Sequence, residues 1–305
     1  MDTRYNKNAK LVNLSAEEGG VLYSFSIVAV LLVTIIFSIA LSLLGNAEEL
    51  LKKDFVIILN YLIGPIAILL AIGILRRKKG VSPIKSINFY SKSKVSLIST
   101  ALIGFGLMFG LAELNTLFVT ALSKFGATIT APTVPAKTFG GVLASIIFIC
   151  LIPSVVEEIL FRGLVFNGLK HTGTGFAIIL SGVLFSIFHM SPAQTAYQFV
   201  VGCIYALVIL YSKNLLYCIA MHFVNNLYLI LNYYYFGIKL SGVAFYIVTP
   251  IALVSLVLGI VYLVVKGDKP EDNTVNKGEL RLKFLLGSAI GIVVAIVMWI
   301  AGLVA

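Results

Sequence analysis

Two adjacent carboxylates lie deep inside a long apolar stretch of the sequence, shortly before an arginine. They are Glu157 and Glu158, and Arg162 follows them. In a helix Glu158 and Arg162 stand one turn apart on the same face, where opposite charges can pair. Glu157 points about 100° away from Glu158. This spacing predicts one paired carboxylate and one unpaired carboxylate, and the unpaired one is a candidate general base.

Two histidines occur in similar apolar stretches further along the chain. His189 follows Phe185 by one helical turn and precedes Pro192, which would end the helix just after the histidine. His222 precedes Asn226 by one turn, so both side chains can donate hydrogen bonds to one point beside their helix. A lone histidine or asparagine inside a membrane often makes only an interhelical hydrogen bond, so it is the combination of these groups that makes them candidates for chemistry.

The composition places these groups in a membrane. Of the 305 residues 59% are hydrophobic and 12% are charged, whereas a soluble domain carries roughly 25% charged residues. The net charge of +10 would suit nucleic acid, but nearly all charges fall in short segments between apolar runs. We therefore expect no nucleic-acid partner. An ionisable side chain inside a membrane costs about 3 kcal/mol or more, so the groups above need a structural or chemical reason.

Nine apolar runs approach the roughly 20 residues that a helix needs to cross the hydrocarbon core. Only helices suit an open chain in lipid, because every backbone group must be satisfied internally. The sequence therefore predicts an all-α polytopic transmembrane bundle of about eight or nine spans, of which the fifth is short. The predicted spans are 21–45, 55–75, 95–123, 139–169, 174–190, 194–212, 215–235, 243–265 and 284–304.

The basic residues predict an orientation for this bundle. With the N-terminus inside, the cytoplasmic segments hold 17 of the 23 Lys and Arg residues and the opposite side holds five. Because cytoplasmic loops are enriched in Lys and Arg, we expect the N-terminus in the cytoplasm and the C-terminus outside. The chain shows no organellar signal, which favours the plasma membrane.

The elements that position the chemistry are the fourth, fifth and seventh spans. The fourth carries the two carboxylates, and Pro153 predicts a kink just before them. The fifth span carries His189 near its end, and the seventh carries His222. All of these groups fall within the bilayer, so tilted helices could bring them to one cavity.

The ordered motifs Glu-Glu-x-x-x-Arg, Phe-x-x-x-His and His-x-x-x-Asn resemble those of the CAAX protease and bacteriocin-processing (CPBP) family. That family includes the type II CAAX prenyl endopeptidases. The resemblance covers residues 139–236. It implies a peptidase core within a single membrane domain, 1–305, flanked by transmembrane helices in 1–138 and 237–305.

The resemblance implies an intramembrane endopeptidase that hydrolyses a peptide bond of a membrane-associated protein or peptide, with a prenylated substrate as one option. In this assignment Glu157 is the general base, and it activates a water molecule together with His189. His222 and Asn226 donate to the developing oxyanion. The expected partners are the peptide or prenylated protein substrate and membrane lipid, and no cofactor is favoured. The supporting residues are Glu158 and Arg162.

Zinc is the alternative for the same protease. One glutamate and two histidines form a known catalytic zinc set, and Glu157, His189 and His222 could supply it. The HExxH motif is absent, and no acidic residue stands one turn from either histidine to orient it. We therefore favour the metal-free mechanism.

The cysteines have a simpler interpretation. Cys150, Cys203 and Cys218 lie in apolar runs, and their spacing fits no zinc or redox motif. We expect small buried side chains, including Cys218, although it stands one turn before His222. The third histidine, His171, lies in a loop and is expected to be solvated.

A non-enzymatic role is the second class of function. The polar cluster could lock helices together in an immunity or scaffold membrane protein, because a family fold can persist without catalysis. Glu113 and Asn115 in the third span also have both a functional and a structural interpretation. They could contact a proton or substrate, or they could make an interhelical hydrogen bond or line a wet wall.

Overall fold

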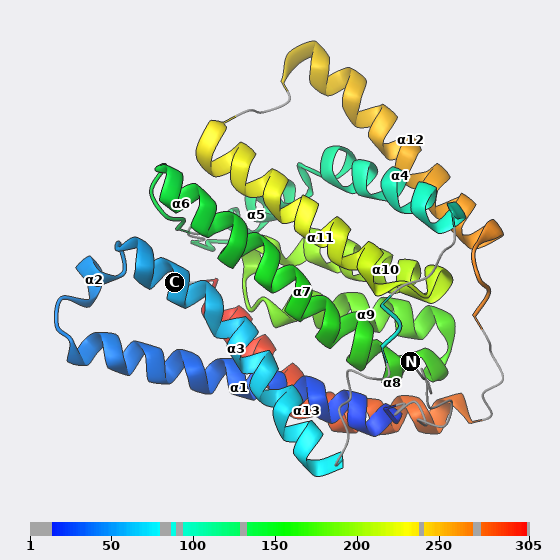
Figure 1. Cartoon of the computed structure of the whole chain (residues 1–305), viewed down its shortest axis with the longest axis horizontal. Coiled ribbons are helices and arrows are strands. Elements are labelled where there is room, and N and C mark those ends of the chain that lie inside the picture. Colours follow the sequence, from blue (N-terminus) through cyan, green and yellow to red (C-terminus); the bar gives the residue numbers. More distant parts are fainter. Residues whose placement is uncertain are drawn as a thin grey trace, which may run out of the picture.

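The chain folds as a bundle of helices. The computed structural model describes residues 14–79, 87–89, 94–128, 133–237, 241–270 and 276–303, and these residues form helices without strands (Figure 1). Among them, eight helices are long and apolar enough to cross a membrane. The predicted all-α polytopic bundle is therefore confirmed. The division into a core at 139–236 and flanking helices stays a prediction.

The eight candidate spans overlap eight of the nine predicted ones. Their bounds are Ala16–Leu43, Asp54–Lys79, Ser96–Ser123, Phe139–Thr172, Pro192–Ser212, Leu215–Asn232, Gly242–Lys266 and Lys277–Ala301. In Figure 1 the first two are α1 (Ala16–Leu43) and α3 (Asp54–Lys79), joined through the short α2 (Ala47–Leu50). The last two are α12 (Gly242–Lys266) and α13 (Lys277–Ala301).

The predicted fifth span is too short to cross. It is α9 (Thr174–Phe188), whose 15 residues extend about 22 Å at 1.5 Å per residue, against a core of about 30 Å. Pro192 opens a short turn after it, and α10 (Thr195–Ser212) returns beside α9. His189 therefore stands at the turn of a hairpin that starts and ends on the same side of the bundle.

The predicted third span is interrupted. It consists of α4 (Lys94–Gly110) and α5 (Leu114–Ser123), with the break between them. Gly110 ends α4 where the backbone lies close to Leu253 of α12, so that an added Cβ would be 3.1 Å from that side chain. The break directs α5 toward the start of α10.

The fourth span contains two π-helical stretches. It runs through α6 (Phe139–Ala144), the π-helical η2 (Ser145–Leu151), α7 (Ile152–Glu158), the π-helical η3 (Ile159–Val165) and α8 (Phe166–Leu169). Pro153 lacks a backbone N–H and stands directly after η2. The two carboxylates thus end a short α-helical segment between two stretches of wider winding, a feature often found at functional sites.

The basic ends of the helices lie together at one end of the bundle. The Lys79 ammonium, at the end of α3, is 2.8 Å from the Glu18 carboxylate at the start of α1. Arg281, near the start of α13, donates from Nε to the Thr172 carbonyl at 2.8 Å. The end of α3, the starts of α1 and α13 and the end of the fourth span therefore lie at the same end of the bundle.

The opposite end is joined by contacts of its own. Asp54 at the start of α3 accepts a hydrogen bond from the Ala136 N–H at 2.9 Å, just before α6. The Thr128 N–H, after α5, donates to the Leu303 carbonyl at 2.9 Å, after α13. Helix starts and ends thus alternate between two faces, as a membrane bundle requires.

Glycines bring the helices that carry the site into close contact. Gly182 of α9 faces α10 so closely that an added Cβ would meet Cys203 Sγ at 2.3 Å. Gly202 of α10 faces Gly182, with 2.7 Å from an added Cβ to its Cα. Small residues at such seams allow membrane helices to pack closely, and this seam fixes His189 relative to α10.

Candidate active site

The two adjacent carboxylates of α7 face different neighbours. Glu158 contacts Arg162 and also His222 of α11 (Leu215–Leu229), whereas Glu157 faces His189 after α9. Figure 1 shows α7 between α3 and α11, and both pairs of helices are in contact. The divergence that helical geometry predicted for this pair is therefore present.

Glu158 is the centre of a fully buried cluster. Its Oε1 atom accepts a hydrogen bond from Arg162 Nη1 at 2.9 Å and one from His222 Nδ1 at 2.8 Å. The side chains of Glu158 and Arg162 are 0% exposed, and that of His222 is 5% exposed. The predicted pairing of Glu158 with Arg162 is confirmed, and His222 is a second partner that the sequence did not indicate.

Arg162 is enclosed by aromatic rings. Its guanidinium carbon lies 4.2 Å from the centre of the Phe185 ring and 5.1 Å from that of Tyr205. Nη2 donates to the Gly202 carbonyl at 3.3 Å. A guanidinium is attracted to aromatic faces, so this cation is stabilised by one carboxylate, one carbonyl and three rings, the third being Phe161 at 5.7 Å. It joins α7, α9 and α10 at one point.

His189 is held with a defined tautomer. Its Nδ1 lies 2.8 Å from the Phe185 carbonyl, and because a carbonyl only accepts, Nδ1 carries the proton. Nε2 therefore faces Glu157 Oε2, 3.8 Å away. This distance is too long for a hydrogen bond. The ring packs edge-on against Phe185, with centroids 4.9 Å apart.

Glu157 remains without a hydrogen-bond partner. Its side chain is 13% exposed and that of His189 is 14% exposed, so both border accessible space. Glu157 Oε2 is buried and makes no hydrogen bond to any residue in the described part of the chain. A buried acceptor usually finds a partner. One water molecule in contact with both Glu157 Oε2 and His189 Nε2 would satisfy this acceptor.

The structure changes the interpretation of His222 and Asn226. The sequence predicted that both side chains point at one place as donors, but His222 uses Nδ1 to donate to Glu158. Its Nε2 can then donate only when the ring is an imidazolium. Asn226 stands one turn later on the same face with a partly exposed side chain. No hydrogen bond joins Asn226 to another side chain among the described residues.

A hydrogen bond beside the third motif was missed by the sequence. The buried Asn225 accepts from the Tyr197 hydroxyl at 2.6 Å, which ties α11 to α10. The Tyr197 N–H in turn donates to Asn115 of α5 at 2.9 Å. Asn115 thus makes the interhelical contact that was one of its two interpretations, and Glu113 is exposed at the helix break. The doubled asparagine at 225 and 226 was the only signal for this link.

Two of the three cysteines, Cys150 and Cys218, are buried as predicted, whereas Cys203 is half-buried. Cys150, Cys203 and Cys218 are free thiols. Cys218 donates from its thiol to the Tyr205 carbonyl at 3.5 Å, inside the core. His171 is exposed at a short turn after α8.

The alternative zinc set is not assembled. Within the described ranges, no three His, Cys, Asp or Glu side chains lie together in a group that could hold a metal ion. The reason is geometric: His222 directs Nδ1 to Glu158, whereas His189 directs Nε2 to Glu157. The two histidines therefore serve two different carboxylates rather than one central ion.

Replacement of Arg162 should destabilise the fold strongly. Arg162→Met keeps most of the volume but leaves the Glu158 charge buried and short of a cation, a loss of about 3–5 kcal/mol. The double variant Glu158→Gln with Arg162→Met should recover part of this loss. Unfolding in detergent measures all three proteins. Lys53→Met is the matched control, because it removes an exposed pair with Glu49 at the same spacing and should cost about 1 kcal/mol or less. An equal effect of Arg162→Met and Lys53→Met would contradict the central role of Arg162.

The comparison with known families agrees with this geometry. Residues 137–228 match the family model described as "Type II CAAX prenyl endopeptidase Rce1-like", and the match spans all three motifs. The chain has no match among curated proteins or solved structures. With its eight apolar helices, the protein is an integral membrane protein, and the matched family implies a membrane protease of the CAAX type. Over residues 137–228 the chain is therefore similar to the Rce1-like family of type II CAAX prenyl endopeptidases.

Proposed function

We propose that the protein is an intramembrane endopeptidase in which Glu157 is the general base for hydrolysis of a peptide bond. The observation that carries the proposal is the Glu157 carboxylate, whose buried Oε2 has no hydrogen-bond partner and lies 3.8 Å from His189 Nε2. Oε2 of its neighbour Glu158 is also buried without a partner, but Glu158 Oε1 already binds Arg162 and His222, so we assign the base to Glu157 beside His189.

In the proposed step a water molecule lies between Glu157 and His189. The lone pair on His189 Nε2 helps to hold the water, and Glu157 removes one of its protons as the oxygen attacks the peptide carbonyl. The C–O bond forms and the carbonyl becomes an oxyanion. Glu157 then gives the proton to the leaving nitrogen as the C–N bond breaks. The products are a carboxylic acid and an amine, and Glu157 is regenerated.

The oxyanion is assigned to His222 and Asn226. Glu158 accepts a hydrogen bond from His222 Nδ1 and so holds that ring in place. In the proposed step a proton on His222 Nε2 lets the same ring donate to the oxyanion. Asn226 supplies a second donor one turn later. A donor of this kind contributes about 3 kcal/mol to the transition state.

The substrate is a membrane-associated protein or peptide. The carboxylates lie on α7, within a helix that is apolar enough to cross a membrane. The peptide bond to be cleaved must therefore enter the membrane to the level of α7. A prenylated C-terminus is the substrate class that the family suggests. Leader peptides and the ends of other membrane proteins are further substrate classes that could reach a site at this level of the membrane. Lipid is the second partner, and nucleic acid has no role in this reaction.

We also propose that the N-terminus faces the cytoplasm of a plasma-membrane protein. The support is that the basic helix ends gather at one end of the bundle, because cytoplasmic segments favour Lys and Arg. A membrane-impermeant maleimide on intact cells should label Glu48→Cys, on the outer side, but not Lys78→Cys. Both positions are exposed and should react after permeabilisation. The reverse pattern would contradict the orientation.

Glu157→Gln should abolish cleavage. The amide keeps the shape of the side chain but cannot accept the proton, and loss of a general base lowers a rate by about 10²–10⁴-fold. Wild type and variant are purified in detergent and assayed on quenched peptides, with a farnesylated peptide in the panel. The matched control is Glu113→Gln, at an exposed glutamate in the break between α4 and α5, which should retain full activity.

The unfolding midpoints of the two variants separate catalysis from stability. We expect Glu157→Gln to unfold like wild type, because no hydrogen bond of Glu157 Oε2 is lost. Equal cleavage by wild type and Glu157→Gln would refute the assignment. The same pair of variants in cells addresses the non-enzymatic role, since an immunity or scaffold function would survive the substitution at unchanged protein level.

Cleavage should be unaffected by a chelator. The two histidines of the site are directed to two different carboxylates, and no metal enters the proposed step. The assay is repeated after incubation with EDTA or 1,10-phenanthroline, with a known zinc protease as the positive control. Activity that is lost in chelator and restored by Zn²⁺ would replace the glutamate mechanism with the zinc mechanism.

A further inference from the structure

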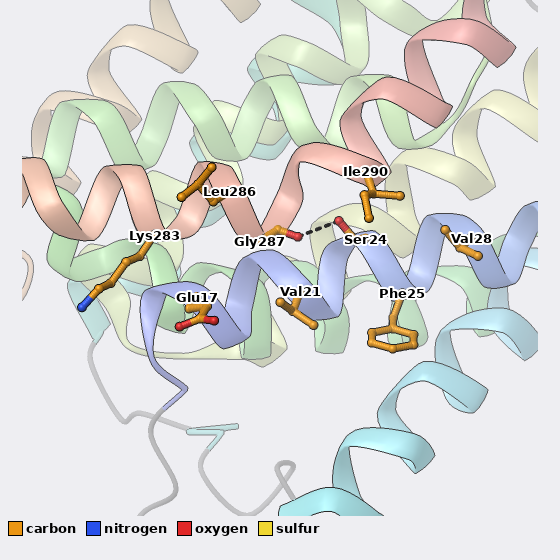
Figure 2. Close-up of a pocket in the computed structure, with 9 residues that line it drawn as sticks. All are labelled: Glu17, Val21, Ser24, Phe25, Val28, Lys283, Leu286, Gly287 and Ile290. Atoms are coloured by element: carbon orange, nitrogen blue, oxygen red, sulfur yellow. Dashed lines mark hydrogen bonds between the residues drawn. The ribbon is translucent and has the colours of Figure 1, made fainter.

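A groove lies between α1 and α13, away from the candidate active site (Figure 2). It encloses about 510 Å³. α1 turns the opposite face to the core, where the Tyr23 hydroxyl donates to the Leu184 carbonyl at 3.3 Å. The groove therefore opens to the surroundings of the bundle rather than to Glu157. It is lined by Glu17, Val21, Ser24, Phe25, Val28, Lys283, Leu286, Gly287 and Ile290.

At the bottom of the groove, small residues allow the backbones of α1 and α13 to lie close together. Gly20 of α1 lies against the Phe284 carbonyl of α13, 2.3 Å from where a Cβ would stand. Ser24 Oγ donates to the Gly287 carbonyl at 2.8 Å and accepts from the Gly291 N–H at 3.0 Å. Two helix backbones in such close contact leave a concave seam, and larger side chains form its rims.

The groove is charged at one end and apolar along the rest. Glu17 and Lys283 stand at the end where α1 and α13 begin, which is the basic end of the bundle (Figure 2). The rims beyond them carry exposed apolar side chains, among them Phe25 and Leu286. From Glu17 to Val28 the helix rises about 16 Å, close to half of the roughly 30 Å hydrocarbon core. These dimensions match one acyl chain of one leaflet.

The two charges define the headgroup that would fit. Lys283 is 2.6 Å from Glu279, and an ammonium has three N–H donors, so two remain for a phosphate. Glu17 makes no ion pair with any residue in the described ranges. A headgroup with a phosphate and a primary ammonium would satisfy Lys283 and Glu17 together. A phosphate without an ammonium would leave Glu17 unpaired beside an anion.

We propose that this groove is a binding site for an aminophospholipid of the phosphatidylethanolamine class. The phosphate binds Lys283, the ammonium binds Glu17, and one acyl chain lies along the seam toward Val28. The bound lipid covers both α1 and α13. Because Arg281 of α13 is hydrogen-bonded to the end of the fourth span at Thr172, the lipid would also steady the helix that carries the carboxylates. The site is independent of the proposed chemistry at Glu157.

The headgroup assignment is tested with the full chain in detergent micelles that contain equal amounts of phosphatidylethanolamine and phosphatidylglycerol. Native mass spectrometry counts the lipids that remain bound. Wild type should retain phosphatidylethanolamine preferentially. Glu17→Gln should reduce that preference by about threefold, the effect of one exposed ion pair. Glu48→Gln, at an exposed glutamate on the other side of the bundle, should leave it unchanged. Preference for phosphatidylglycerol, or no effect of Glu17→Gln, would overturn the assignment.

The acyl-chain part is tested by filling the groove. Ile290→Trp places a large ring on its rim, at a side chain that is 67% exposed, and the matched control Ile36→Trp lies on α1 outside the groove and is 66% exposed. Only Ile290→Trp should lower the retained phosphatidylethanolamine, with unfolding midpoints of both variants near that of wild type. Equal lipid retention by both variants would overturn the site. A dimer that Ile290→Trp dissociates would assign the groove to a second copy of the chain instead.

Discussion

The Arg162 guanidinium is a cation without exposed surface inside a bundle of apolar helices, and the rest of the site is arranged around it. Such a charge is tolerated only when it is paired and hydrogen-bonded. Glu158, the Gly202 carbonyl and the rings of Phe185 and Tyr205 provide those contacts. These partners come from α7, α9 and α10. Satisfying one buried charge therefore fixes three helices relative to one another.

That constraint separates two carboxylates that are adjacent in the sequence. Glu158 binds both Arg162 and His222 through Oε1, so we assign it a structural and electrostatic role. Glu157 points about 100° away and meets only a histidine whose proton is already held by a carbonyl. Adjacent residues of one helix thus supply both the candidate base, Glu157, and the carboxylate that stabilises the Arg162 cation, Glu158. The aromatic rings that stabilise Arg162 also support the imidazoles, since Phe185 packs against both His189 and His222.

Contacts within a single helix could be predicted from the sequence, whereas contacts between helices could not. The pairing of Glu158 with Arg162 and the divergence of Glu157 follow from the helical period, and both were correct. The assignment of His222 to Glu158 and of His189 to Glu157 depends on the rotation of α11 and α9 against α7, which no local pattern encodes. The break before α5 was missed because hydropathy measures only apolar length, which merged α4 and α5 into one predicted span, 95–123. The shortness of α9 was expected from the sequence, where Pro192 follows soon after His189.

The two π-helical stretches explain how one helix serves both histidines. A regular helix from Phe139 to Leu169 would fix the direction of every side chain by a single period. Here η2 ends before Ile152 and η3 begins after Glu158, so α7 can rotate as a short segment relative to the helix on either side of it. Arg162 lies within η3 and still pairs with Glu158 of α7 at 2.9 Å. We therefore regard the irregular winding, which is frequent at functional sites, as part of the site: it sets how α7 as a whole is turned toward α11 and the end of α9, while the helical period within α7 separates Glu157 from Glu158.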